Sequence, residues 1–226
     1  MRLITQADEN LFQTIVVAAK LGRADPLVER LNDQYAEDWE NPQAAFPYAL
    51  AVVAMLQADV SGFEKHASFN EALETLNDIL YTDPAHWLAQ YLRARLRTMI
   101  PSSLIYKTYL DMERDKAGEG SQELIEVQAA AAWQPYFVSA YALAAHTPGE
   151  DGRDPAHVGK TIREAAEAGP RSRVPYPALG AILCEPLVAL YMDVTLPERE
   201  LIATMMRELY PDQPAVRDAL GRFPIP

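Results

Sequence analysis

The stretch from residue 69 to residue 99, FNEALETLNDILYTDPAHWLAQYLRARLRTM, decides the fold class of this chain. Its leucines recur every three or four positions on both sides of a central turn, at Leu73, Leu76, Leu80, Leu88, Leu92 and Leu96. This spacing places them on one face of an α-helix. Asp83-Pro84 marks the boundary, because Asp suits the N-cap and Pro loses nothing at the first helical position. The stretch therefore predicts two helices joined by a short turn.

The same two signals extend outward along the chain. Asn or Asp also precedes Pro at 25–26, 41–42 and 154–155, each time before an apolar helical pattern. Strand-like alternation is nearly absent. The periodicity predicts helices near residues 8–22, 26–39, 42–60, 69–82, 84–99, 102–115, 121–133, 135–146, 155–168, 178–192, 197–210 and 214–221. The predicted fold class is all-α.

The spacing of these helices also predicts their organisation. Most connections are short, so that consecutive helices pack antiparallel. Apolar stripes continue on both sides of every loop-like stretch, including residues 117–121. We therefore expect one continuous domain over residues 1–226, with a weak boundary at 147–153. Pro135 and Pro186 fall inside apolar patterns and predict breaks or kinks.

Residues 72–84 carry a resemblance to a known family. Ala72, Leu76, Ile79 and Pro84 stand where tetratricopeptide-type repeats place small, large, small and proline residues in their second helix. The segment thus resembles half of one such repeat. The resemblance implies an irregular stack of antiparallel helix pairs, a tetratricopeptide-like α-solenoid. It also implies a scaffold with a concave binding groove and no catalysis.

Composition restricts the function classes. The formal net charge of −12 and the isoelectric point near 4.8 disfavour binding to nucleic acid and to anionic lipid. The single cysteine, Cys184, lies in an apolar run and is expected to be buried. The first residues lack the apolar core of a signal peptide, and no stretch of roughly 18 apolar residues predicts a membrane span. We therefore expect a cytoplasmic protein.

One segment of this acidic chain contains no acidic residues. Residues 84–110 contain no Asp or Glu, but they contain five side chains that suit partner recognition: Trp87, Tyr91, Arg93, Arg97 and Lys107. Arg93 and Arg97 are four residues apart and share one helical face. Arginine beside aromatic rings suits an acidic peptide or another anion. The alternative is internal pairing of these arginines with acids on neighbouring helices, such as Glu71, Glu74 and Asp78.

Other constellations favour structural roles. Asp83-x-x-His86 and Asp154-x-x-His157 resemble metal-ligand spacing, but each Asp is better explained as an N-cap with its His on the surface. No serine-nucleophile or phosphate-loop motif is present. The loop at 169–176, with Arg171 and Arg173, is interpreted as a connector or a small binding loop. We predict no catalytic residue, no metal and no cofactor, and an enzyme is the less favoured interpretation.

These observations predict a non-catalytic protein-interaction scaffold. Its partner is a protein or peptide, with an acidic segment as one option, and it binds a groove near residues 69–115. The alternative is a small-molecule-binding or enzymatic domain with an enclosed aromatic pocket, lined by Trp87, Tyr91, Trp133, Tyr136 and Tyr141. Assembly with further copies of the same chain, through an exposed apolar helix, is a third option.

Overall fold

The part of the protein that its computed structural model describes consists of α-helices joined by turns and short irregular segments. The described residues are 4–39, 41–56, 62–99, 112, 113, 116, 119, 120, 137–146, 155–167, 173–193 and 195–225, without the side chains of 62–68, 137, 146 and 155. Every regular element among them is a helix, which confirms the all-α prediction. The chain divides into two compact units, residues 1–117 (unit 1) and 118–226 (unit 2). This division falls in the loop-like stretch 117–121. The weak boundary predicted at 147–153 lies outside the described residues. The single continuous domain over residues 1–226 stays a prediction.

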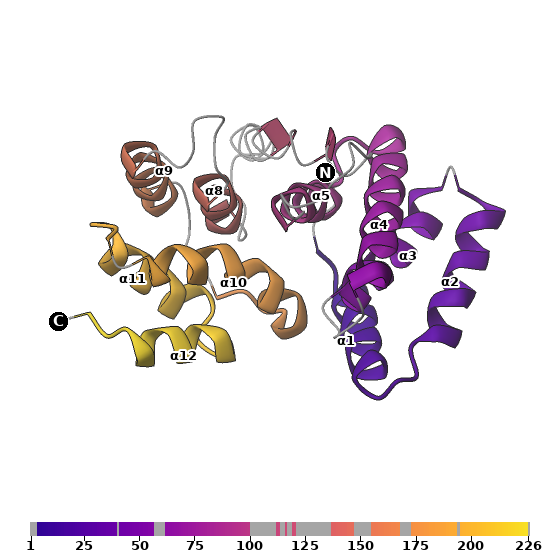
Figure 1. Ribbon diagram of the computed structural model, residues 1–226, viewed down its shortest axis with the longest axis horizontal. Helices are drawn as coiled ribbons and strands as arrows, with labels where there is room; N and C mark the ends of the chain where they lie inside the picture. Colours follow the sequence, from indigo (N-terminus) through magenta and orange to yellow (C-terminus); the bar gives the residue numbers. More distant parts are fainter. Residues whose placement is uncertain are drawn as a thin grey trace. The chain divides into compact units, whose positions relative to one another are not determined.

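Unit 1 is built around one apolar helix. Its described helices are α1 (Gln6–Lys20), α2 (Asp25–Glu37), α3 (Pro42–Leu56), α4 (Gly62–Thr82) and α5 (Trp87–Met99). Helix α3 contacts α1, α2 and α4, and α5 packs on α4 (Figure 1). A helix that is apolar on every side must be surrounded by other elements. Accordingly, nine of the ten residues of α3 from Ala45 to Ala54 are buried.

Unit 2 repeats this principle with another apolar helix. Its described helices are α8 (Phe137–His146), α9 (Pro155–Glu167), α10 (Pro177–Met192), α11 (Arg199–Leu209) and α12 (Pro214–Arg222). Helix α10 contacts α8, α11 and α12, and α9 packs on α8 and α11 (Figure 1). Cys184 lies fully buried in the middle of α10, as its apolar surroundings predict. Helix α10 also continues through Pro186, so that proline does not end the helix.

The predicted helix starts are only partly correct. Asn41 caps α3 as predicted, because the Gln43 N–H donates to its Oδ1 atom at 3.0 Å. Asp25 is instead the first residue of α2, and Ala24 precedes it without a side-chain cap. Helix α4 begins at Gly62, earlier than the predicted residue 69. The helices predicted at 102–115 and 121–133 lie almost entirely outside the described residues.

The start of α5 corrects the prediction for His86. Asp83 accepts a hydrogen bond from the Ala85 N–H at 3.2 Å, but this closes a turn and α5 begins only at Trp87. His86 caps the helix instead, because its Nδ1 atom accepts from the Ala89 N–H at 3.3 Å. Its ring packs on Phe46 with a centroid distance of 4.3 Å and is buried. A surface position was therefore wrong for His86, whereas His157 is exposed as predicted.

Candidate functional site

The aromatic residues of α5 lie inside unit 1. Trp87 and Tyr91 are fully buried, one helical turn apart. Their rings stack at a centroid distance of 5.3 Å with an interplanar angle of 20°. Stacked rings of this kind add stability beyond the burial of their area. In this structure both side chains therefore contribute to the core of unit 1.

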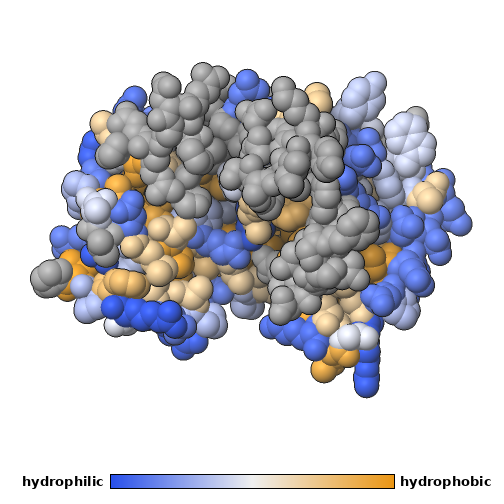
Figure 2. Space-filling view, in the orientation of Figure 1, coloured by the Kyte–Doolittle hydropathy of each residue, from blue (hydrophilic) through white to orange (hydrophobic). Residues whose placement is uncertain are grey.

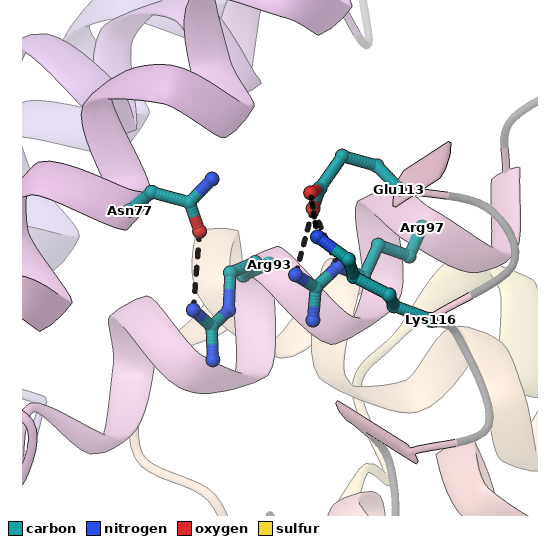
Figure 3. Close-up of polar contacts among 5 residues, drawn as sticks. All are labelled: Asn77, Arg93, Arg97, Glu113 and Lys116. Carbon is teal, nitrogen blue, oxygen red and sulfur yellow. Dashed lines mark hydrogen bonds and ion pairs between the residues drawn. The ribbon is translucent and has the colours of Figure 1, made fainter. Parts of the chain in front are cut away.

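Arg97 is buried in an ion cluster with Glu113 and Lys116. The Arg97 Nε atom donates to the Glu113 carboxylate at 2.8 Å, its Nη2 atom lies 2.7 Å from the same oxygen, and Lys116 Nζ reaches the other oxygen at 2.9 Å (Figure 3). Burial alone would raise the pKa of Glu113, but hydrogen bonds from Lys116 and Arg97 and their charges outweigh it and lower that pKa. The cluster therefore keeps a buried carboxylate ionised.

Arg93 is also engaged with its own unit. Its Nη1 atom donates to the Asn77 side-chain oxygen of α4 at 3.1 Å (Figure 3). Arg95 is buried as well. Since α5 is enclosed on nearly every side, an acid-free sequence is what its burial requires: a carboxylate without a cationic partner would be costly there. These contacts favour the internal-pairing alternative, and a binding role for Arg93 and Arg97 stays a prediction.

The other predicted site residues are separated or undescribed. Lys107, Trp133 and Tyr136 lie outside the described residues. Tyr141 lies in α8 of unit 2, where burial and then the charge of Glu164 raise the pKa of its phenol. The enclosed aromatic pocket stays a prediction, because the structure describes only three of its five rings.

A tyrosine network joins α2, α3 and α4 of unit 1. The Tyr35 hydroxyl donates to Asp78 of α4 at 2.7 Å, and the Tyr48 hydroxyl donates to Glu71 of the same helix. The rings of Tyr35 and Tyr48 stack at 5.5 Å. Burial, followed by the bond to Asp78, raises the pKa of Tyr35 to about 12, and burial and Glu71 raise that of Tyr48 further. The network holds the last turn of α2 against α4.

Two large aromatic side chains are exposed beside this network. Trp39 lies just beyond the end of α2 and is 52% exposed, and Tyr81 lies in the last turn of α4 and is 85% exposed. Because Tyr35 of the last turn of α2 bonds to Asp78, one turn from the end of α4, the C-terminal ends of both helices lie together. Exposed aromatic residues of this size mark interaction surfaces more often than single exposed aliphatic residues do.

The same helix ends are acidic. Residues 31–39 contain three acids and residues 69–83 contain four, with no Lys or Arg in either stretch: Asp33, Glu37, Asp38, Glu71, Glu74, Asp78 and Asp83. Hydrophilic residues dominate the surface formed by α2, at the right of Figure 2. A helix C-terminus carries partial negative charge, so acids there are unfavourable and bases are favourable. We call Trp39, Tyr81 and the acids Glu37, Asp38, Asp78 and Asp83 the α2–α4 end.

Unit 2 contains a separate cavity of about 470 Å³. Its walls come from the segment before α10 and from the segment between α11 and α12: Arg173, Val174, Pro175, Pro177, Leu209, Tyr210, Pro211, Asp212 and Gln213. The Val174 N–H donates to the Leu209 carbonyl at 2.9 Å, which fixes the two segments side by side. Residues 173–175, in the described part of the predicted loop at 169–176, thus supply one wall, and the exposed Arg173 lies at the cavity rim.

Within the described residues, no three or more His, Cys, Asp and Glu side chains gather as they would around a metal ion. In the same part of the chain no helix is long and apolar enough to cross a membrane. Comparisons with protein-family models, with curated proteins and with solved structures find no match to this chain.

Proposed function

We propose that the chain is a non-catalytic protein-interaction module that binds a basic segment of a partner protein at the α2–α4 end. The observation that carries this proposal is the placement of acids and exposed aromatic rings at two adjoining helix C-termini. Neither α2 nor α4 has a basic residue in its last turn. A partner Lys or Arg would relieve this unfavourable accumulation of negative charge.

The aromatic residues complement the acids in this role. Lys and Arg bind the faces of Trp and Tyr rings as well as carboxylates. Trp39 and Tyr81 therefore provide contact area where Glu37, Asp38 and Asp83 provide charge. Only the part of this surface at the end of α4, with Asp78, Tyr81 and Asp83, lies within the predicted region of residues 69–115, whereas Glu37, Asp38 and Trp39 lie outside it. The proposal changes the expected partner from an acidic to a basic segment, because Arg97 is buried against Glu113.

The test compares partner capture by the wild type with capture by two charge-matched variants. The first variant, Glu37→Gln/Asp38→Asn, removes two charges from the α2–α4 end. The second, Glu185→Gln/Glu200→Gln, removes two exposed charges from unit 2. We expect a stoichiometric partner, identified by mass spectrometry of pull-downs from native lysate, to be lost in the first variant and kept in the second.

A synthetic peptide then tests the chemistry of recognition. The peptide copies the Lys- or Arg-rich segment of the captured partner, and its affinity is measured by titration against wild type and Trp39→Ala/Tyr81→Ala. Loss of the rings should weaken binding at least about tenfold, which corresponds to about 1.4 kcal/mol. Equal binding of the partner to both charge variants would refute the basic-segment proposal. Loss of the partner only when Arg93 and Arg97 are substituted would also refute it.

A further inference from the structure

The cavity of unit 2 has the build of a small-ligand site. Its volume of about 470 Å³ lies within the range of roughly 300–1,000 Å³ that is usual for small-molecule pockets. Its floor is buried and mostly apolar, with Val174, Leu209 and Tyr210 all less than a tenth exposed. Three prolines, at positions 175, 177 and 211, form much of the remaining wall. Because the proline ring fixes φ, these three residues restrict the backbone of the walls.

One wall is fixed by a buried amide. The Gln213 side chain is 7% exposed and donates from Nε2 to the Pro177 carbonyl at 2.8 Å. It fits there because the neighbouring helix position is Gly180: a Cβ atom at that position would lie only 2.8 Å from Gln213 Nε2. The Tyr210 hydroxyl is likewise engaged, with Ser139 of α8. The polar groups of the walls are thus held in place before any ligand arrives.

The rim combines one positive and one negative group. Arg173 and Asp212 form an ion pair across the cavity lining, and their side chains are 62% and 61% exposed. An exposed ion pair contributes little net stability, so its partners can be exchanged at small cost. A ligand that carries an ammonium and a carboxylate group on the same carbon atom can replace each partner at once. Helices α10 and α12 also begin at the cavity, and their positive ends favour the anionic group of such a ligand.

We propose that this cavity binds a free α-amino acid with an apolar side chain. The Arg173 guanidinium binds the carboxylate in a bidentate ion pair, and the Asp212 carboxylate binds the ammonium group. The side chain of the ligand lies against the apolar floor formed by Val174, Leu209 and Tyr210. This site is independent of the proposed function, since it lies wholly in unit 2 and the α2–α4 end lies in unit 1.

The test is titration calorimetry of the full chain with leucine, isoleucine, valine, methionine, phenylalanine and tryptophan. We expect saturable binding of at least one of them. The N-acetyl and the amide derivatives of that amino acid each lack one charge, and they stand for the last and the first residue of a peptide. Each derivative should bind at least tenfold more weakly than the free amino acid.

Three variants locate the site. Arg173→Gln and Asp212→Asn should each weaken binding at least tenfold, and both remain folded by circular dichroism because their side chains are exposed. The matched control is Arg222→Gln/Asp218→Asn, which removes another exposed ion pair, 4.0 Å long, on α12. This control should bind as tightly as the wild type.

Three results would overturn the proposal. The first is the absence of saturable binding for all six amino acids in the wild type. The second is tight binding of the N-acetyl or the amide derivative, which would assign the cavity to a peptide terminus. The third is equal affinity in Arg173→Gln, Asp212→Asn and the control, which would place the ligand elsewhere on the chain.

Discussion

At the scale of single residues, the buried ion cluster of α5 distinguishes two arginines that look equivalent in the sequence. Arg97 is buried against Glu113, whereas Arg93 is half-buried and bonds to the neutral Asn77. Removing one partner of a buried ion pair costs more than losing a hydrogen bond to a neutral side chain, because the remaining charge stays buried. Their roles in stability should therefore differ.

We predict that Arg97→Ala lowers the free energy of unfolding by about 3 kcal/mol, the lower end for a broken buried ion pair, because Lys116 still pairs with Glu113. Arg93→Ala should lower it by less, about 1.5 kcal/mol, the lower end for a hydrogen bond that involves a charged group. Urea denaturation followed by circular dichroism measures both. Equally small losses would contradict a structural role for Arg97 and would leave both arginines available for the predicted partner-binding face, whereas equally large losses would make both structural.

The Tyr35–Asp78 bond makes stability depend on pH in the alkaline range. Below pH 10 the phenol is protonated in folded and unfolded chains, so its contribution is fully present. The pKa of Tyr35 is about 12 in the folded chain against 10.0 for an unperturbed tyrosine, so the unfolded chain loses the proton first. Stability should therefore fall as pH rises from 10 through 12.

Tyr35→Phe should remove part of this alkaline loss, and Tyr48, whose pKa is also raised, should account for the remainder. At pH 7 the same change should cost about 1.5 kcal/mol, because a hydrogen bond to a charged group is lost. The measurement is urea denaturation at several pH values. The control is Tyr81→Phe, on an exposed ring, and an identical alkaline slope in all three proteins would refute the role of Tyr35.

At the scale of helices, acidic residues stabilise the N-terminus of α1 but are unfavourable at the C-terminus of α2. Helix α1 has a complete capping box at its N-terminus, in which the Thr5 N–H donates to Asp8 at 2.8 Å and the Asp8 N–H donates to Thr5 at 3.2 Å. Helix α2 places Glu37 and Asp38 at its C-terminus, where the dipole opposes them. The first arrangement serves folding, and the second is consistent with binding.

We therefore predict stability changes of opposite sign for the same chemical change. Glu37→Gln/Asp38→Asn should stabilise unit 1 by up to about 1 kcal/mol for each charge, less at high salt. Asp8→Asn should destabilise it by about 1 kcal/mol, because it weakens the capping box. The shift in urea midpoint measures both changes. A loss of stability in the α2 variant would show that these acids support the fold, and would weaken the proposed binding role of the α2–α4 end.

Sequence patterns predicted the helices better than their surfaces, for a physical reason. Apolar spacing and proline positions are local properties, so α3, α5 and α10 could be placed within a few residues. The burial of Arg97 depends on Glu113, and that of His86 depends on Phe46, which lie far away in the sequence. The acid-free segment at 84–110 was a correct signal of an unusual environment. Its meaning, an enclosed helix rather than an exposed face at residues 87–97, required the tertiary contacts.

The exposed and hollow features were the hardest to predict. Trp39 follows Tyr35 by four residues, the spacing of a core residue on a helix. It is exposed because α2 ends at Glu37, before this position. The cavity of unit 2 forms from two segments that lie far apart in the sequence. They are joined by the Val174–Leu209 backbone bond, by the Gln213–Pro177 bond and by the Arg173–Asp212 ion pair. The proline-flanked loop around Arg173 was the single sequence signal that pointed to the cavity.

At the scale of the whole molecule, each unit has what an independently folding domain needs. An independently folding domain requires a hydrophobic core of its own. Unit 1 encloses α3, and unit 2 encloses α10. Each unit spans more than 100 residues, which is a usual size for a single domain.

We therefore predict that fragments 1–117 and 118–226 each fold when expressed alone. Both should show helical far-UV circular dichroism and one cooperative unfolding transition, because each contains a complete buried helix with its neighbours. Fragment 1–117 should also keep Glu113, so that Arg97→Ala destabilises it as much as it destabilises the full chain. Fragments that are unfolded apart but regain helicity when mixed would instead establish the one continuous domain that the sequence predicts, with a core that neither unit completes by itself.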